Sequence, residues 1–248
     1  MPDQLKICAV IPTYNNAGTL AGVLDGVSEH ISELIVVNDG STDGTSALLA
    51  ESGHPSTLVE FPKNKGKGAA LKAGLRKARE LGFDYAITID SDGQHFPSDI
   101  PAFLEAIQAN PGAMILGSRN LQAENMPSGS TFANRFSNFW FTVQTAKKLP
   151  DTQTGFRAYP LRKLPCLGLL TRRYEAELEL LVFSAWRGVK LIPVPVRVIY
   201  PEDRVTSFRP GADFTRISVL NTILCVLAIV YGYPRMILHK IFNMENRM

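Results

Sequence analysis

The 248-residue chain has few cysteines and no dense cluster of positive charge. Its three cysteines, Cys8, Cys166 and Cys225, are widely spaced and form no Cys-x-x-Cys pair. This spacing argues against a disulfide framework or a zinc site and favours a reducing compartment. The net charge is only +3, with scattered lysines and arginines, so we do not expect a nucleic acid partner. A basic segment followed by a long apolar run is missing at the N-terminus, so we expect no secretory signal.

Two common nucleotide-binding motifs are also missing. No Gly-x-Gly-x-x-Gly follows the first apolar segment, and no Gly-x-x-x-x-Gly-Lys-[Ser/Thr] occurs in the chain. The first absence argues against a dinucleotide-dependent oxidoreductase, and the second against a P-loop nucleotide hydrolase. A nucleotide, if one binds, must be held in another way.

The chain does carry enough apolar sequence for a large core, with 45% hydrophobic and 20% charged residues. Short apolar segments typical of strands, at 7–11, 34–37, 57–61, 85–90 and 114–116, alternate with segments whose apolar residues recur at helical spacing. This order predicts the α/β class, with a Rossmann-like, mostly parallel central sheet covered by helices on both faces. We expect a domain at residues 1–210, followed by an apolar helix and basic tail at 211–248.

Polar clusters follow four of the expected strands. They comprise residues 13–15, 38–41, 63–68 and 90–94. Because the carboxyl ends of parallel strands meet at one edge of a sheet, where ligands bind, we expect these clusters to share one rim.

The cluster at 90–94 has the chemistry of a site for a hard cation. Asp90, Asp92 and Gln94 supply two carboxylates and an amide, the ligand types that suit Mg²⁺ or Mn²⁺, and they leave coordination positions for substrate phosphates. An Asp-Ser-Asp-Gly turn closed by side-chain hydrogen bonds would give the same sequence without a metal. Both interpretations stay open at this point.

Taken in order, these motifs resemble those of the family 2 glycosyltransferases of GT-A fold, particularly the polyprenyl-phosphate sugar synthases such as dolichol-phosphate mannose synthase. The resemblance covers roughly residues 5 to 210. The segments that carry it are 12–15, 38–43, 64–68, 90–94, 117–119, 134–135, 151–157 and 175–177. The chain has Asn16 and Asn38 where many members have acidic residues, so the base and the sugar of the donor stay open.

The resemblance implies an inverting, metal-dependent enzyme that moves a hexose from a GDP- or UDP-linked sugar. The implied metal ligands are Asp90, Asp92 and Gln94, with Asp92 essential for catalysis. Arginine guanidinium groups bind phosphate oxygens with directional bonds, so Arg119, Arg135 and Arg204 are candidate catalytic phosphate clamps. Arg157 is a further candidate, although a solvated or salt-bridged surface position is the simplest interpretation for it. The acceptor phosphate would contact Arg119, Arg135 and Asn138. The residues implied to hold the nucleotide sugar are Pro12, Thr13, Tyr14, Asn15, Asn38, Asp39, Lys67, Asp90 and Ser91.

The acceptor decides whether a general base is needed. A polyprenyl (dolichyl or undecaprenyl) phosphate is already anionic, whereas a hydroxyl needs a carboxylate to take its proton. Polysaccharide-building relatives carry an additional acidic pair and a Gln-x-x-Arg-Trp signature, and neither is found here, so the phosphate acceptor is favoured. Asp151, Glu175 and Glu177 are possible bases, or supports for an arginine, if a hydroxyl of a glycan or lipid is the acceptor. A non-catalytic nucleotide-sugar binding module is a third interpretation.

Two segments suggest contact with lipid. Aromatic residues recur at helical spacing in 131–148, which fits either a core helix or an apolar ramp for a lipid tail. Residues 217–234 are uncharged and about 27 Å long as a helix, just short of a hydrocarbon core. This helix could lie in the membrane interface, span the membrane or be buried, and the first fits slightly better. We therefore expect the protein at the cytoplasmic face of a membrane.

Overall fold

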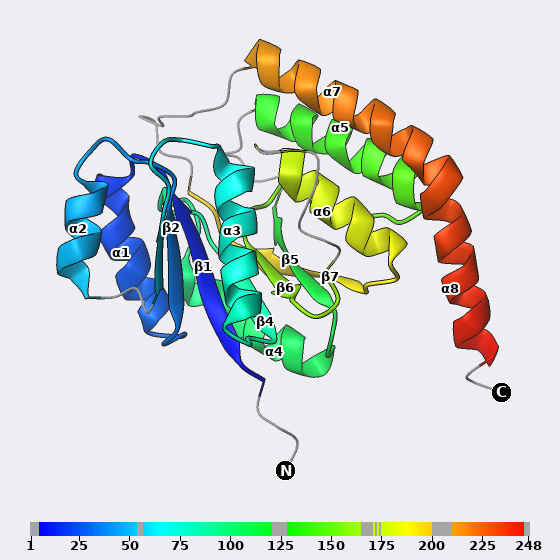
Figure 1. Ribbon diagram of the computed structural model, residues 1–248. Helices are drawn as coiled ribbons and strands as arrows, with labels where there is room; N and C mark the ends of the chain where they lie inside the picture. Colours follow the sequence, from blue (N-terminus) through cyan, green and yellow to red (C-terminus); the bar gives the residue numbers. More distant parts are fainter. Residues whose placement is uncertain are drawn as a thin grey trace.

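The computed structural model describes residues 5–53, 57–120, 128–164, 171, 173, 175–199 and 210–245, with side chains described throughout except at 128–131, 210–214 and 242–245. A seven-stranded sheet forms its centre, in the order β3-β2-β1-β4-β6-β5-β7 (Figure 1). The strands are β1 (Ile7–Thr13), β2 (Leu34–Asn38), β3 (Thr57–Glu60), β4 (Tyr85–Thr88), β5 (Met114–Arg119), β6 (Arg157–Pro160) and β7 (Leu191–Val196).

The sheet is mostly parallel, as predicted. Only β6 runs antiparallel, between β4 and β5. The sequence analysis did not predict β6 or β7. The edge strand β7 contains Pro193 and Pro195, both exposed, which is tolerated because prolines on a free edge remove no ladder hydrogen bond. β1 also extends through Pro12 to Thr13. Its pairing with β4 ends earlier, at Val10.

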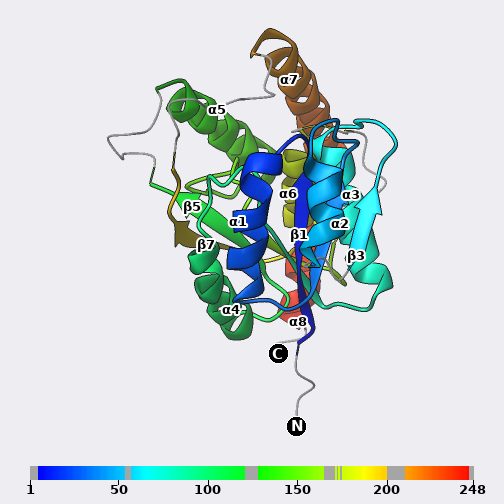
Figure 2. The ribbon, with the colours of Figure 1, turned by 90° about the vertical axis from the view of Figure 1, so that its left-hand side faces the viewer.

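Helices cover both faces of the sheet. One face is packed by α1 (Ala17–Ser28), α2 (Thr45–Ser52) and α4 (Ile100–Ala109), which a short 3₁₀ turn (Pro97–Asp99) precedes. The other is packed by α3 (Lys67–Glu80), α5 (Ser128–Thr145) and α6 (Glu175–Trp186). In Figure 2, α1 lies in front of the sheet, on the side away from α6. The predicted α/β class with two covered faces is thereby confirmed.

The C-terminal segment consists of α7 (Pro210–Leu227), a π-helical turn (Ala228–Gly232) and α8 (Tyr233–Glu245). Leu220, Leu224 and Ala228 pack into the core under α5 and α6, and α7 lies along α5 (Figure 1). Within this segment Thr215–Ile241 is, among the described residues, one helix long and apolar enough to cross a membrane by length and composition. The polar side chain of Asn221 in α7 is buried, whereas the apolar side chains of Val219, Ile223 and Val226 in the same helix are exposed.

Helix α3 approaches the sheet closely at Gly74. A Cβ atom added there would lie 2.4 Å from Val10 Cγ1 and 3.1 Å from Val37 Cγ2. The helix therefore packs directly on β1 and β2, the two strands whose carboxyl ends carry the predicted nucleotide site. This packing fixes the start of α3, at Lys67, relative to the rim.

We expect Gly74→Ala to lower the free energy of unfolding by about 1–3 kcal/mol, because the added methyl group overpacks the contact with Val10. The matched control is Gly22→Ala in α1, where no atom lies within 4 Å of the added Cβ. That control should gain about 0.5–1 kcal/mol from helix propensity. Urea unfolding followed by circular dichroism measures both, and equal effects of the two substitutions would contradict the packing argument.

Candidate functional site

The site forms at the carboxyl ends of β1, β2 and β4, where the predicted rim lies. Thr13 ends β1, and its carbonyl oxygen accepts a hydrogen bond of 2.9 Å from the Asp39 N–H at the end of β2. Its side chain is buried, and within the described part of the chain the Thr13 Oγ1 has no hydrogen-bond partner. Tyr14 beside it is 37% exposed. A buried hydroxyl without a partner is a position where a ligand could supply the missing bond.

Asn15 connects the loops that follow β1 and β2. Its backbone has φ 54°, in the left-handed region that Asn tolerates better than most residues. Its Oδ1 accepts a bond of 2.8 Å from the Thr42 N–H, and its own N–H donates to Ser41 Oγ at 3.0 Å. The expected donor-binding residue therefore also holds two loops together.

Asn38 and Asp39 use their side chains inside the protein. The Asn38 amide donates to Ser46 Oγ at 2.8 Å and to Glu60 Oε1 at 3.3 Å, while its Oδ1 accepts from the Ser41 N–H. The Asp39 carboxylate accepts from the N–H groups of Lys65 and Gly66 at 2.7 and 2.8 Å. These contacts organise the loop before α3. Burial raises the pKa of Asp39, although the loop N–H groups oppose that shift.

The turn after β4 contains the expected metal ligands. Asp92 Oδ1 accepts from the Gln94 N–H at 3.0 Å, so the turn is closed by the side-chain hydrogen bond that the sequence left open. The preceding Ser91 is buried and accepts from Asn16 Nδ2 at 2.9 Å, which ties the turn to α1. Asp90, Asp92 and Gln94 are all partly exposed. No group of three or more His, Cys, Asp and Glu side chains able to hold a metal gathers in the described residues. Two carboxylates and an amide nevertheless match the ligand preference of Mg²⁺ or Mn²⁺ when substrate oxygens complete the coordination.

Lys67 joins this turn to α6. Its Nζ donates to Asp90 Oδ2 at 2.9 Å and lies 3.3 Å from Glu177 Oε1. Burial raises the pKa of Asp90, but the neighbouring positive charges, Lys67 first among them, together outweigh this effect, so the net pKa is lowered. Asp90 is thus held as an anion at the rim.

His95 lies directly after Gln94 but stays outside the expected metal ligands. It is buried, its ring meets Phe156 edge-on at 5.4 Å, and its Nδ1 has no hydrogen-bond partner within the described residues. Burial lowers the pKa of His95 to about 4, with Asp90 opposing the shift and Lys67 supporting it. The imidazole is therefore neutral near pH 7.

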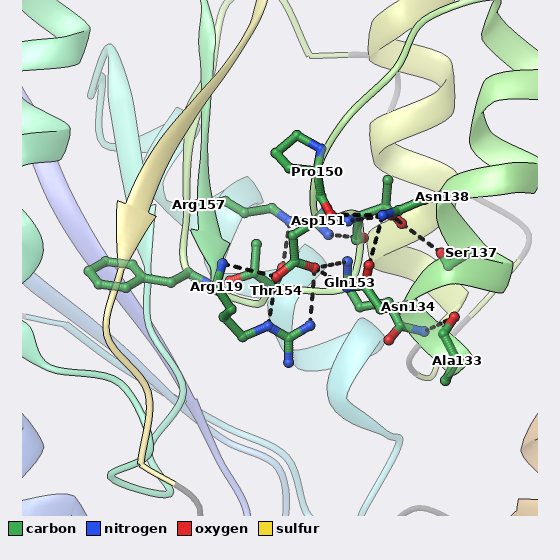
Figure 3. Close-up of polar contacts among 12 residues, drawn as sticks. Arg119, Ala133, Asn134, Ser137, Asn138, Pro150, Asp151, Gln153, Thr154 and Arg157 are labelled. Atoms are coloured by element: carbon green, nitrogen blue, oxygen red, sulfur yellow. Dashed lines mark hydrogen bonds and ion pairs between the residues drawn. The ribbon is translucent and has the colours of Figure 1, made fainter. Parts of the chain in front are cut away.

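A second polar cluster centres on Asp151 (Figure 3). The Arg119 guanidinium binds both carboxylate oxygens, with Nε at 2.6 Å and Nη2 at 3.0 Å. Asn134 Nδ2 and the Gln153 N–H donate to Oδ1 at 2.5 and 2.9 Å. Burial raises the pKa of Asp151, but Arg119 and the Gln153 N–H together outweigh it, so the net pKa is lowered. Asp151 thus holds Arg119 in place, and both of its oxygens are already engaged in hydrogen bonds.

Helix α5 carries polar side chains on both its buried and its exposed side. Asn138 bonds inward, with its Nδ2 donating to Pro150 O and its Oδ1 accepting from the Thr152 hydroxyl, both at 2.8 Å. Arg135, one residue after the buried Asn134, is exposed. Arg204, the remaining expected clamp, lies outside the described residues.

Arg157 corrects one expectation, since a surface position seemed the simplest interpretation for it. The side chain is fully buried, and its guanidinium donates to the carbonyl oxygens of Thr152, Thr154 and Glu177 at 2.7–2.9 Å. Three carbonyl oxygens thus satisfy the buried guanidinium. Arg157 therefore joins β6 to α6.

Both acidic residues expected at the start of α6 are buried. Glu177 contacts Lys67, whereas Glu175 Oε2 has no hydrogen-bond partner among the described residues. The sequence analysis gave no role to Glu179, which accepts from Thr171, or to the amide of Asn134. Asn134 lies in the motif segment 134–135, so the sequence already marked this residue. The sequence did not show that Asp151 is its hydrogen-bond partner.

The structure thus brings two groups of expected residues together. Lys67 and Glu177 lie next to Asp90 in the turn after β4, while Asn134 and Asn138 lie beside the Asp151–Arg119 pair. The direct contacts with nucleotide, acceptor and metal are not tested by these observations and stay predictions.

Several known proteins are similar to this chain. Residues 8–164 match the family model described as Glycosyl transferase family 2. The UDP-N-acetylglucosamine–dolichyl-phosphate N-acetylglucosaminyltransferase of Methanococcus voltae is 31% identical over 223 residues, covering 82% of this chain and 88% of the relative. The undecaprenyl-phosphate mannosyltransferase of Micrococcus luteus is 28% identical over 211 residues, covering 80% and 85%.

Solved structures share the fold. Glucosyl-3-phosphoglycerate synthase from Mycobacterium tuberculosis, in complex with Mn²⁺, UDP-glucose and phosphoglyceric acid, superposes with a TM-score of 0.64 at 20% identity, covering 90% of this chain and 79% of that one. At that identity the likeness shows the GT-A fold alone. Together with the family match over residues 8–164, it establishes that the chain belongs to glycosyl transferase family 2 and is a glycosyltransferase of the GT-A fold.

Proposed function

We propose that the enzyme transfers a hexose from a nucleotide-diphosphate sugar to a polyprenyl phosphate at a membrane surface, with inversion at the anomeric carbon. The observation that carries this proposal is the position of α5. One side of this helix supports the Arg119–Asp151 pair through Asn134, and its exposed side carries Arg135, Phe132 and Phe139. A lipid phosphate and its apolar tail need such neighbouring polar and apolar surfaces. The relatives named for dolichyl and undecaprenyl phosphate support the same acceptor class.

The reaction needs no general base. An ionised phosphate oxygen of the acceptor attacks C1 of the sugar, the C1–O bond to the diphosphate breaks, and the bonding electrons leave with the nucleotide diphosphate. Attack opposite to the leaving group inverts C1. Arg119, held in place by Asp151, would orient the attacking phosphate, because a guanidinium paired on one edge still presents N–H groups on another. Arg135 and Arg204 complete the proposed clamp.

The donor would lie over the ends of β1 and β2, beside Thr13, Tyr14 and Asp39. We propose that Asp90, Asp92 and Gln94 hold a divalent cation there, a role that suits the chemistry of this ligand set. Such an ion, when bound, neutralises charge on the leaving diphosphate, an effect worth several kcal/mol in general. Among the protein's own groups, Lys67 keeps Asp90 ionised, and Asn15 and Asp39 hold the surrounding loops.

The proposed membrane contact is an apolar face formed by α5, α7, the π-helical turn and α8. Its exposed residues are Phe132, Phe139, Val143, Val219, Ile223, Val226, Ile229, Val230, Tyr231, Ile237, Leu238 and Ile241. Arg216, Arg235 and Lys240 are exposed on the same helices, and residues 215–241 contain no acidic residue. An apolar surface with basic residues suits a leaflet containing anionic lipids.

Several contacts favour a segment that lies on the membrane over one that spans it. Gln144 Nε2 in α5 donates to Asn221 Oδ1 in α7 at 2.9 Å, and both residues are buried. The Tyr233 hydroxyl in α8 donates to Val143 O in α5. A span perpendicular to the domain would break these two bonds and leave buried polar groups unpaired. We therefore propose that the segment lies in the membrane interface, and that the enzyme works at the cytoplasmic face of that membrane.

A second candidate acceptor is a hydroxyl group of a glycan or another lipid. The unpartnered, buried Glu175 Oε2 favours it, because a general base must have an oxygen available for the incoming proton. The same orphan oxygen could instead accept a bond from a sugar hydroxyl of the donor. Glu175 as a general base and Glu175 as a hydrogen-bond acceptor for the donor would give different values and pH profiles of kcat.

The proposed function is tested by incubating the protein with Mn²⁺, labelled UDP- and GDP-sugars, and undecaprenyl or dolichyl phosphate. We expect a lipid-linked sugar with one of these donors, and at least a hundredfold slower formation with Asp92→Ala, since charge stabilisation of this kind is worth about 3 kcal/mol or more. Asp25→Ala, an exposed position in α1, is the matched control and should behave as the natural protein. Sugar transferred only to a hydroxyl acceptor would refute the phosphate proposal.

The two roles of Glu175 are separated by the pH dependence of Glu175→Gln. With a phosphate acceptor, we expect kcat to change less than tenfold and its pH profile to keep its shape, because no proton passes to Glu175. A general base would lose roughly 10²–10⁴-fold in kcat and the acidic limb of the pH profile. The second result would establish the hydroxyl-acceptor reaction.

Membrane binding is tested with vesicles of phosphatidylcholine alone or mixed with phosphatidylglycerol. We expect Ile229→Asp combined with Val230→Asp to weaken binding at least tenfold, because each apolar side chain contributes about 1.5–3 kcal/mol when fully buried. Leu58→Asp, on the far edge strand β3, is the control and should bind as the natural protein. Alkaline carbonate should release the bound protein. Retention after carbonate treatment would instead show a membrane span.

A further inference from the structure

Lys67 lies between two carboxylates that come from different parts of the chain. Its Nζ is 2.9 Å from Asp90 Oδ2, in the turn after β4, and 3.3 Å from Glu177 Oε1, in the first turn of α6. The side chains are 23%, 22% and 10% exposed for Lys67, Asp90 and Glu177, so solvent screens these contacts only in part. The ammonium thus lies within hydrogen-bonding distance of a residue that we expect to bind the metal.

The backbone at Gly155 encloses this ion pair. A Cβ atom added to Gly155 would lie 2.6 Å from Asp90 Oδ2 and 3.0 Å from Lys67 Nζ. The carbonyl oxygen of Gly155 is fixed by the Thr88 hydroxyl at 2.7 Å. Lys67 and Asp90 are therefore packed against a fixed segment on that side, and Glu177 offers the ammonium a second carboxylate within reach.

A divalent cation on Asp90 would be close to the ammonium. Mg²⁺ binds carboxylate oxygens at about 2.1 Å, so an ion on either oxygen of Asp90 would lie within a few ångströms of Lys67 Nζ. Two positive charges at that separation repel strongly in a partly buried site. The ammonium and the metal consequently compete for the same carboxylate, unless the ammonium moves to another anion.

We propose that Lys67 couples metal binding to donor binding. Without nucleotide, its ammonium neutralises Asp90 and weakens the affinity for a divalent cation. When a nucleoside diphosphate binds with the metal, the ammonium transfers its hydrogen bonds from Asp90 to a diphosphate oxygen, and Glu177 keeps it close to the site. Lys67 is in this account a positioning residue that makes the metal and the nucleotide bind together. This inference rests on the proposed metal role of Asp90 and adds to it a linkage between the two ligands.

The test measures free Mn²⁺ by electron paramagnetic resonance while Mn²⁺ is titrated into the purified full chain, with and without UDP or GDP. We expect Lys67→Gln to bind Mn²⁺ at least tenfold more tightly than the natural protein when no nucleotide is present. Lys65→Gln is the matched control, because Lys65 is an exposed lysine of the same loop whose Nζ lies over the Phe61 ring. Its Mn²⁺ affinity should not change.

The change in Mn²⁺ affinity on adding nucleotide is a second measurement of the same linkage. A saturating concentration of UDP or GDP should increase Mn²⁺ affinity at least tenfold more in the natural protein than in Lys67→Gln. Glu177→Gln should weaken Mn²⁺ binding without nucleotide at least threefold, because the ammonium loses a carboxylate that draws it away from Asp90. Circular dichroism of each variant checks that it is folded.

The outcomes separate this inference from the proposed function. If Asp90→Asn abolishes Mn²⁺ binding while Lys67→Gln binds no more tightly than the natural protein, the linkage is wrong and the metal site stands. If Asp90→Asn binds Mn²⁺ as tightly as the natural protein, both the metal assignment and the linkage are wrong.

Discussion

Buried and half-buried carboxylates near the carboxyl ends of the strands and in the segment before β6 need a local partner, and this electrostatic requirement organises the candidate site. Asp39 is satisfied by two backbone N–H groups of the loop before α3, Asp90 by Lys67, and Asp151 by Arg119 and Asn134. Each partner comes from a different element from its carboxylate. These same contacts hold the loops and helices around β2, β4, α3 and α5 in place relative to one another.

Helix α5 connects this polar rim to the apolar surface. Its inward polar side chains, Asn134, Asn138 and Gln144, bond in succession to Asp151, to the 150–152 segment and to α7. Its outward side carries Arg135 and two exposed phenylalanines. A movement of α5 relative to the proposed membrane would therefore shift Asn134 and, through Asp151, the position of Arg119. Acceptor recognition and membrane attachment share one rigid element in the proposed function.

The sequence predicted the features that depend on local pattern. Alternating apolar segments predicted the parallel strands and the rim at their carboxyl ends. One of the two interpretations of residues 90–94, a turn closed by a side-chain hydrogen bond, is also found in the structure. Pairings distant in sequence could not be predicted in the same way. The burial of Arg157 was not predicted, because it depends in part on the carbonyl group of Glu177, 20 positions away. Strand β6 was missed because Arg157 and Pro160 interrupt its apolar pattern and because it lies directly after the polar segment 151–156. The apolar C-terminal segment was recognised, but which of its sides faces the protein was decided by Asn221 and Gln144, 77 positions apart.

The two exposed prolines of β7 have a consequence for how many copies of the enzyme can share a surface. Proteins confined to a bilayer meet each other at high local concentration and in similar orientations, which are the conditions that favour pairing between open sheet edges. Pro193 and Pro195 leave the free edge of β7 without two of the N–H donors that an incoming strand would need. On the proposed membrane, neighbouring copies could then lie close together without their sheets pairing through β7.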